Sequence, residues 1–168
     1  MTLPDRSRRA LWAGSAPAPI RPPWAHEEAV FVDLCTRCQA CTEACPQQII
    51  EVGDGGFPQL SFARGGCTLC HACVAACTPQ ALVAQPGRAP WRHVARIDNA
   101  CLALHGVMCR SCDDLCDSGA LRFHPQPGGL SQPAIEAELC SGCGACVSPC
   151  PVQAVTMQAG PEALPPKG

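Results

Sequence analysis

The sequence contains no tyrosine, and aromatic residues make up only 4% of its 168 residues. Bulky apolar side chains supply most of the buried surface of an ordinary core, so a chain this poor in aromatics needs another source of folding energy. The net charge of −2 gives no general attraction to nucleic acid or to an anionic membrane. No apolar run approaches the length of a transmembrane helix. We therefore expect no nucleic-acid partner and no membrane span.

Cysteine, by contrast, is abundant: there are 16 cysteines, and all of them fall into four sets of four. Three sets have the spacing C-x2-C-x2-C-x3-C, the run that holds iron–sulfur clusters in bacterial ferredoxins. The remaining set keeps the last two intervals but has its first interval stretched to eight residues. The regular sets are Cys35, Cys38, Cys41 and Cys45; Cys67, Cys70, Cys73 and Cys77; and Cys140, Cys143, Cys146 and Cys150. The stretched set is Cys101, Cys109, Cys112 and Cys116.

These sets predict [4Fe–4S] clusters, because four thiolates complete the four iron corners of a cubane and thiolate is a soft ligand that suits iron. In two-cluster ferredoxins the fourth cysteine of a run ligates the other cluster. Under that rule the ligand groups are Cys35, Cys38, Cys41 and Cys77; Cys67, Cys70, Cys73 and Cys45; Cys140, Cys143, Cys146 and Cys116; and Cys101, Cys109, Cys112 and Cys150. The alternative is that the stretched set is degenerate and the last set binds one cluster alone. We therefore expect three or four clusters per chain.

Three other uses of cysteine fit the spacing less well. A secreted disulfide scaffold does not explain why cysteines recur at positions i, i+3 and i+6. Structural zinc sites usually take two close pairs separated by a longer loop. Cys67-Thr-Leu-Cys70-His71 matches the covalent haem motif, but haem attachment would remove two cysteines from a set of four. We instead expect His71 to be exposed or to lie beside a cluster sulfur.

An internal repeat that does not use cysteine spacing supports all four sets. The third residue after the last cysteine of each set is Gln48, Gln80, Gly119 or Gln153. A pair of small or branched apolar residues follows each time. We expect this pair to pack beneath the cluster, where it keeps water away from the sulfurs.

The repeat and the linker Pro86–Pro90 divide the chain into two predicted halves, residues 29–86 and 94–160. In the first half, residues 29–34 have the composition of a strand. Two further strands are expected from Ile49 and from Phe57, separated by a glycine-rich turn. The predicted fold class is α+β: two tandem bacterial-type two-cluster ferredoxin-like halves, loop-rich, with the clusters serving as core.

The two ends of the chain are predicted to lie outside these halves, as a flexible arm over residues 1–28 and a frayed tail over residues 161–168. Ser7-Arg8-Arg9-Ala10-Leu11-Trp12 resembles a twin-arginine export motif, but several prolines and Arg21 interrupt the apolar stretch that a working signal needs. We therefore expect a cytoplasmic protein. The arm is either a disordered tail or a docking segment, and its candidate partner contacts are Arg8, Arg9, Trp12 and Trp24.

The whole pattern resembles the NapF family of ferredoxin-type proteins. The segments that carry the resemblance are Ser7-Arg8-Arg9, Arg21-Pro22-Pro23-Trp24-Ala25, Cys35-Thr-Arg-Cys38, Gly53-Asp54-Gly55-Gly56-Phe57-Pro58, and Cys101-Leu-Ala to Val107-Met-Cys109-Arg-Ser-Cys112. Thr78 before Pro79 and the stretched set depart from the plain cysteine motif. The resemblance implies a cytoplasmic protein with several [4Fe–4S] clusters. It also implies interaction with the precursor of the catalytic subunit of periplasmic nitrate reductase, and a role in assembling or reducing that subunit's own cluster before export.

Two functions are compatible with these residues. The first is an accessory protein that binds one partner precursor and acts through its clusters. The second is a polyferredoxin that passes single electrons to a reductase. In a third reading the clusters only stabilise the fold, but up to four clusters in so small a chain exceed what stability requires. Every cysteine belongs to a cluster set, and the sequence has no P-loop and no Ser/His/Asp order, so we expect no enzyme activity of its own.

Overall fold

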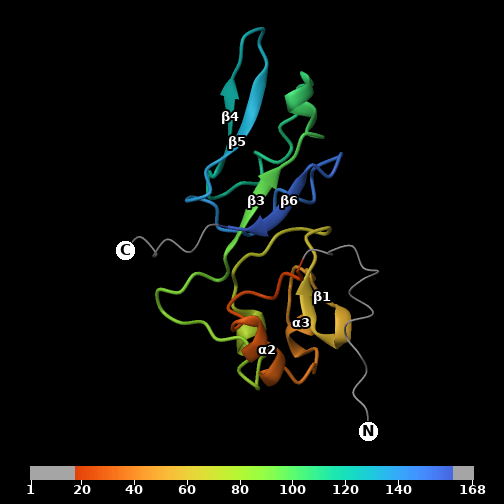
Figure 1. Ribbon diagram of the computed structural model, residues 1–168, viewed down its shortest axis with the longest axis vertical. Coiled ribbons are helices and arrows are strands. Elements are labelled where there is room, and N and C mark those ends of the chain that lie inside the picture. The colour runs from red at the N-terminus through yellow and green to blue at the C-terminus, as the bar shows by residue number, and fades with distance from the viewer. Residues whose placement is uncertain (1–17, 161–168) are drawn as a thin grey trace.

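The computed structural model describes residues 18–160, which form two units stacked along the long axis of the molecule (Figure 1). Both units are built mostly from loops that connect short helices and strands. The first unit contains α2 (Glu28–Leu34), α3 (Ala40–Glu43), β1 (Ile50–Val52), the 3-10 helix η1 (Asp54–Gly56), β2 (Pro58–Leu60) and α4 (Ala72–Ala75). The second contains β3 (His93–Ile97), the 3-10 helix η2 (Leu102–His105), β4 (Leu121–Pro125), β5 (Ser131–Ile135) and β6 (Val155–Ala159).

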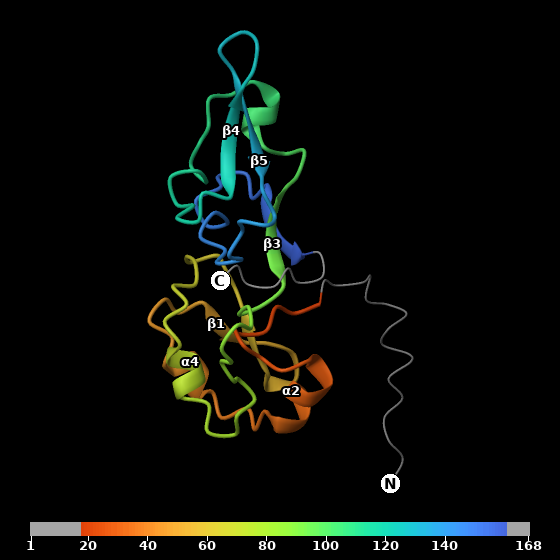
Figure 2. The same ribbon diagram turned by 90° about the vertical axis from the view of Figure 1, so that its left-hand side faces the viewer.

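Within residues 18–160 the strands form three antiparallel two-stranded sheets. The β1–β2 pair runs from Ile50 opposite Leu60 to Val52 opposite Pro58, and follows the two strands predicted on either side of the glycine-rich turn. The β3–β6 pair joins the first and last strands of the second unit, so this sheet closes that unit (Figure 2). The β4–β5 pair is a hairpin that extends to the far end of the molecule (Figure 1). None of the helices in this part of the chain is long and apolar enough to cross a membrane.

The strand predicted over residues 29–34 is wrong, because these residues lie in the helix α2. Only Phe31 enters the core, whereas Val30 and Val32 on either side of it are 46% and 37% exposed. The alternation of apolar residues therefore does not mark a strand with one buried face. Glu28 in the first helical turn is near the unpaired N–H groups of the helix start, and it also pairs with Arg21 at 2.6 Å.

The predicted arm is also wrong for residues 18–28, which are part of the first unit. The side chain of Trp24 is only 6% exposed. Its backbone N–H donates to the Pro90 carbonyl at 2.6 Å, and its carbonyl accepts from the Val83 N–H at 2.9 Å. Trp24 is therefore a core residue and not an exposed partner contact. Arg8, Arg9, Trp12 and the predicted tail lie outside the described residues.

Cysteine side chains take the place of bulky residues in both cores. In the first unit, buried Cys41 and Cys73 lie in one cluster with Phe31, Ile49 and Leu82. In the second unit, Cys112 and Cys146 lie in one cluster with Ala95, Leu121 and Val155. The low aromatic content is thus matched by a core in which sulfur occupies central positions.

We predict that Phe31→Ala strongly destabilises the first unit, because Phe31 is fully buried beneath the Arg21 guanidinium, which lies 5.1 Å from its ring centroid. Truncation of a buried phenylalanine costs about 3–5 kcal/mol. The midpoint of chemical denaturation, measured anaerobically by circular dichroism, should fall accordingly. Val30→Ala, one position earlier on the same helix and 46% exposed, is the control and should change little. Equal effects of the two substitutions would contradict the burial of Phe31.

Candidate iron–sulfur sites

The loops of the three regular sets share one backbone conformation around the second cysteine. The residues on its two sides, one before it and one after it, have positive φ angles between 54° and 74°. These pairs are Arg37 and Gln39, Leu69 and His71, and Gly142 and Gly144. Left-handed residues at these positions turn backbone N–H groups toward the sulfurs. The Leu69 N–H, for example, donates to the Cys67 Sγ at 3.4 Å.

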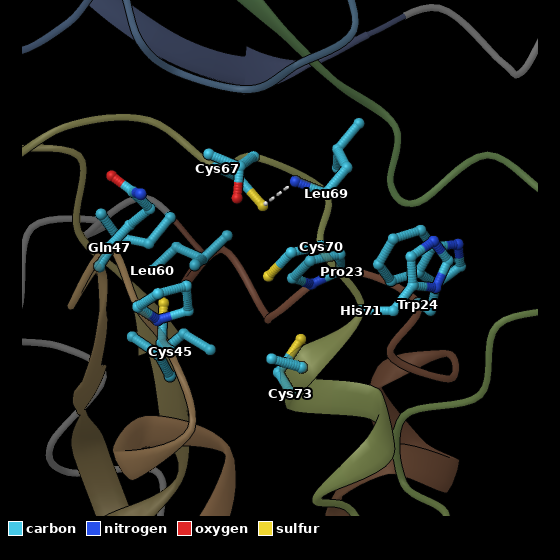
Figure 3. Close-up of a pocket in the computed structure, with 15 residues that line it drawn as sticks. Pro23, Trp24, Cys45, Gln47, Leu60, Cys67, Leu69, Cys70, His71 and Cys73 are labelled. Atoms are coloured by element: carbon cyan, nitrogen blue, oxygen red, sulfur yellow. Dashed lines mark hydrogen bonds between the residues drawn. The ribbon is translucent and has the colours of Figure 1, made fainter.

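Each regular loop faces a cavity that also receives one cysteine from another set. Figure 3 shows the cavity of the second loop, with the sulfurs of Cys45, Cys67, Cys70 and Cys73 around one shared space. The first loop and the last loop are built in the same way. The cavity of the first loop is lined by Cys35, Cys38, Cys41 and Cys77, and that of the last loop by Cys140, Cys143, Cys146 and Cys116.

The stretched set also brings its cysteines together, although its loop differs. Cys112 is buried, and this burial is the main cause that raises its pKa to about 11. The nearby thiols of Cys101, Cys109 and Cys150 raise it further, which places all three close to Cys112. The inserted residues form η2, which ends at Gly106 in the left-handed region. Neither neighbour of Cys109 has a positive φ angle, so this loop lacks the paired turn of the other three.

These arrangements fit a cubane better than a single metal ion. The sulfurs of a set surround a cavity, as four corner ligands of a [4Fe–4S] cluster must. No three His, Cys, Asp or Glu side chains within residues 18–160 converge on a position for one ion. Backbone N–H groups supply donors to the sulfurs, and such hydrogen bonds are a recognised means of tuning cluster potential.

The residues after each last cysteine explain the internal repeat. Gln48, Gln80, Gly119 and Gln153 all have positive φ angles, between 51° and 63°. Each N–H donates to the carbonyl of the last cysteine of its set, at 2.9–3.2 Å. This turn sends the following apolar pair inward, and all four pairs are buried as expected. The pairs are Ile49 and Ile50, Ala81 and Leu82, Ala120 and Leu121, and Ala154 and Val155.

The pair also returns a backbone donor to the cluster sulfurs. The Leu121 N–H donates to the Cys116 Sγ at 3.3 Å, and the Ala154 N–H donates to the Cys150 Sγ at 3.2 Å. In these two sets, the repeated tail therefore both packs a buried apolar pair beside the last cysteine and hydrogen-bonds to its sulfur.

His71 is exposed and lines the cavity of the second set, as predicted for a residue beside a cluster sulfur. Sequence reasoning did not identify its partner, Trp24, whose ring stacks on the imidazole with centroids 4.0 Å apart (Figure 3). Trp24 and Pro23 close the outer side of this cavity. The only indication in the sequence is the Pro22-Pro23 pair, which fixes an extended backbone next to Trp24.

The thiols of one loop differ in acidity. Burial raises the pKa of Cys73 from its ordinary value of 9.0 to about 12, and that of Cys146 likewise to about 12. In contrast, the Ala72 N–H lowers the pKa of the exposed Cys70, and the Ala40 N–H lowers that of Cys38. The exposed second cysteine of a loop is therefore the more reactive thiol, and the buried third cysteine is the less reactive one.

We predict that after anaerobic removal of iron, iodoacetamide alkylates Cys70 before Cys73, because the thiolate is the reacting form. The rate at Cys70 should reach half its maximum below pH 9.0, because its pKa is lowered from that value, whereas the rate at Cys73 should keep rising toward its pKa of about 12. Peptide mapping by mass spectrometry measures both sites in one sample. Equal rates at the two cysteines would show that the loop conformation requires the cluster. The iron-loaded protein, in which both sites should be protected, is the control.

Comparisons with known proteins agree with this geometry. A model described as a 4Fe-4S dicluster domain matches residues 34–102 and again residues 107–154. The ferredoxin-type protein NapF of Haemophilus influenzae is 49% identical over 138 residues, which are 82% of this chain and 78% of that protein. The ferredoxin-type protein NapF of Escherichia coli K12 is 41% identical over 157 residues, covering 92% and 95% of the two chains.

A more distant relative, the methylamine utilization ferredoxin-type protein MauM of Methylobacillus flagellatus, is 29% identical over 89% of this chain and 73% of its own length. The tandem dicluster domains and the 16 cysteines fit three or four [4Fe–4S] clusters per chain. With the high identity over most of both chains, these matches show that the chain belongs to the NapF family of ferredoxin-type iron–sulfur proteins.

Proposed function

We propose that the chain holds four [4Fe–4S] clusters, one for each cysteine set, and that the sets of each half exchange their last cysteines. The observation that carries this proposal is the lining of the cavities. In the first half, Cys45 lines the cavity of the second loop and Cys77 lines that of the first loop. In the second half, Cys116 lines the cavity of the last loop. The position of Cys150 beside Cys112 completes the pattern. The halves themselves are proposed to span residues 29–86 and 94–160, with residues 18–28 packed on the first.

A bound [4Fe–4S] cluster supplies storage for a single electron. The chain's own residues determine where that electron is held and how accessible it is. Thiolates bind the iron, backbone N–H groups such as that of Leu69 offset negative charge on the sulfurs, and the buried apolar pairs exclude water. Cys38 and Cys70 are exposed, so one side of each site in the first half is open to a redox partner.

We further propose that the protein acts in the cytoplasm on the precursor of the catalytic subunit of periplasmic nitrate reductase. In this role it helps to assemble or to reduce the iron–sulfur cluster of that subunit before export. The support is the identity of 41–49% to proteins named NapF, spread over most of each chain. The protein would not turn over a substrate of its own.

A second candidate function is that of a polyferredoxin that donates single electrons to a reductase. The exposure of Cys38 and Cys70 favours it, because an open site permits transfer to more than one acceptor. The two functions differ in the partner: an assembly factor binds one immature protein tightly, whereas a general carrier forms only brief encounters.

The ligand exchange makes a specific prediction for iron content. Anaerobically purified protein should contain four cubanes per chain, and Cys109→Ser should lower iron and acid-labile sulfide by about a quarter, because one of four sites loses a ligand. Ser111→Ala, two residues away and outside the ligand set, is the control. A wild-type content near three cubanes, unchanged in Cys109→Ser, would mean that the stretched set is degenerate.

Iron labelling separates the two candidate functions. Protein loaded with ⁵⁵Fe is mixed anaerobically with the precursor of the nitrate reductase catalytic subunit, or with the mature, cluster-loaded subunit as control. We predict a stable complex with the precursor only, detected by gel filtration. Label that moves to the precursor indicates assembly, and a change in its EPR spectrum without label indicates reduction. Equal electron transfer to both forms without a complex would support the carrier function instead.

A further inference from the structure

The last cysteine loop differs from the first two loops in one respect that its turn geometry does not explain. Positions with the same left-handed conformation carry Arg37, Leu69 and His71 in the first half, but only glycine in the last loop. A Cβ atom on Gly144 would overlap the ring of Phe62. A Cβ atom on Gly142 would overlap Trp91 and the His93 carbonyl. Glycine is therefore required here because another part of the chain lies directly against the loop.

Phe62 belongs to the first unit, and Trp91 lies in the segment that connects the first unit to β3. The Cys67 N–H donates to the Cys143 carbonyl at 2.7 Å. This hydrogen bond joins the backbone of the second cysteine set to that of the last set. A Cβ atom on Gly66 would lie 2.7 Å from the backbone of Ala145. In Figure 3 the ribbon of the second unit passes just above Cys67.

Two aromatic residues reinforce this contact. The Trp91 Nε1 donates to the Ser141 carbonyl at 2.9 Å. The rings of Trp91 and Phe62 meet edge to face with centroids 6.4 Å apart. Phe62 is buried and cannot move aside freely. The contact is therefore a packed interface with directional hydrogen bonds.

Successive cysteine sets are consequently adjacent to one another through both units. In the first unit, Cys41 and Cys73 share a buried core and bring the first set next to the second. In the second unit, Cys112 and Cys146 do the same for the stretched set and the last set. Cys67 and Cys143 join the two central sets across the units. Figures 1 and 2 show the second unit stacked on the first, with β4–β5 at the far end.

We propose that this junction, formed by Phe62, Gly66-Cys67, Trp91 and Ser141–Ala145, is a positioning device that couples the two halves into a single redox unit. Its glycines hold the second and last cysteine sets at a fixed, short separation. The four sets then act as one series, in the order first, second, last, stretched, and not as two independent pairs. The inference rests on the proposed function, because it requires a cluster in each of the two central sets.

Magnetic coupling between reduced clusters tests this proposal. EPR spectra of the fully reduced full-length protein should contain interaction lines from neighbouring clusters. Gly66→Ala and Trp91→Phe alter the junction at two separate points: the first inserts a methyl group against Ala145, and the second removes the hydrogen bond to Ser141. We expect both to retain the full iron content, to remain folded, and to lose the interaction lines of the central pair while those within each half persist. Small-angle X-ray scattering should show a longer particle.

Gly128→Ala is the matched control. A Cβ atom on Gly66 would lie 2.7 Å from Ala145, whereas nothing lies within 4 Å of the Cβ position of Gly128. Gly128→Ala therefore adds a methyl group without a clash, and its spectrum should equal that of the wild type. If Gly66→Ala loses iron, the spectrum of Trp91→Phe, which removes the hydrogen bond to Ser141 and part of the ring contact with Phe62, decides the test.

Two results are decisive against the proposal, and they are distinguishable. Variant spectra that superimpose on the wild type at full iron content would overturn the junction while leaving the proposed clusters in place. A wild-type iron content that excludes a cluster in either central set would overturn the assignment of clusters, and the junction with it.

Discussion

The structure depends on the reach of the last cysteine of each motif into the cavity of another loop. Cys45 and Cys77 exchange places between the first two loops, so neither cavity is complete without the other half of the unit. This mutual dependence compensates for the shortage of bulky apolar residues, because ligand bonds formed at the cavity also stabilise the surrounding fold. Short strands such as β1 and β2 need only hold the loops in register.

Backbone conformation is the second constraint, and it acts at the same residues. Left-handed turns around Cys70 aim N–H groups at sulfur, and the turn at Gln80 buries Leu82. Where the turn faces solvent it carries a side chain, as at His71; where it faces the other unit it is glycine, as at Gly144. The same pair of left-handed residues thus occurs in all three regular cysteine loops, and in the last loop it also allows close packing against the first unit.

The sequence predicts the parts of this structure that repeat at fixed spacing. The cysteine sets, the buried pairs such as Ile49 and Ile50, and the β1–β2 strands all follow from local pattern. The burial of Trp24 does not, because its partners Val83 and Pro90 lie about sixty residues along the chain. The strand predicted over residues 29–34 is wrong for a related reason. Their alternating apolar residues have no partner strand, and only Phe31 is buried in the core. The contact between the two units could not be predicted, because its only trace in the sequence is a few isolated glycines, such as Gly66 and Gly144.

The proposed exchange of last cysteines has a consequence for biosynthesis. During translation, Cys35, Cys38 and Cys41 leave the ribosome well before Cys77, so the first site stays open until almost the whole of the first unit has emerged. In the second unit, Cys101 waits for Cys150, which comes shortly before the closing strand β6. Under the proposed ligand sets, no site of a unit is complete until nearly all of that unit has been translated, and until then its free thiols are open to oxidation.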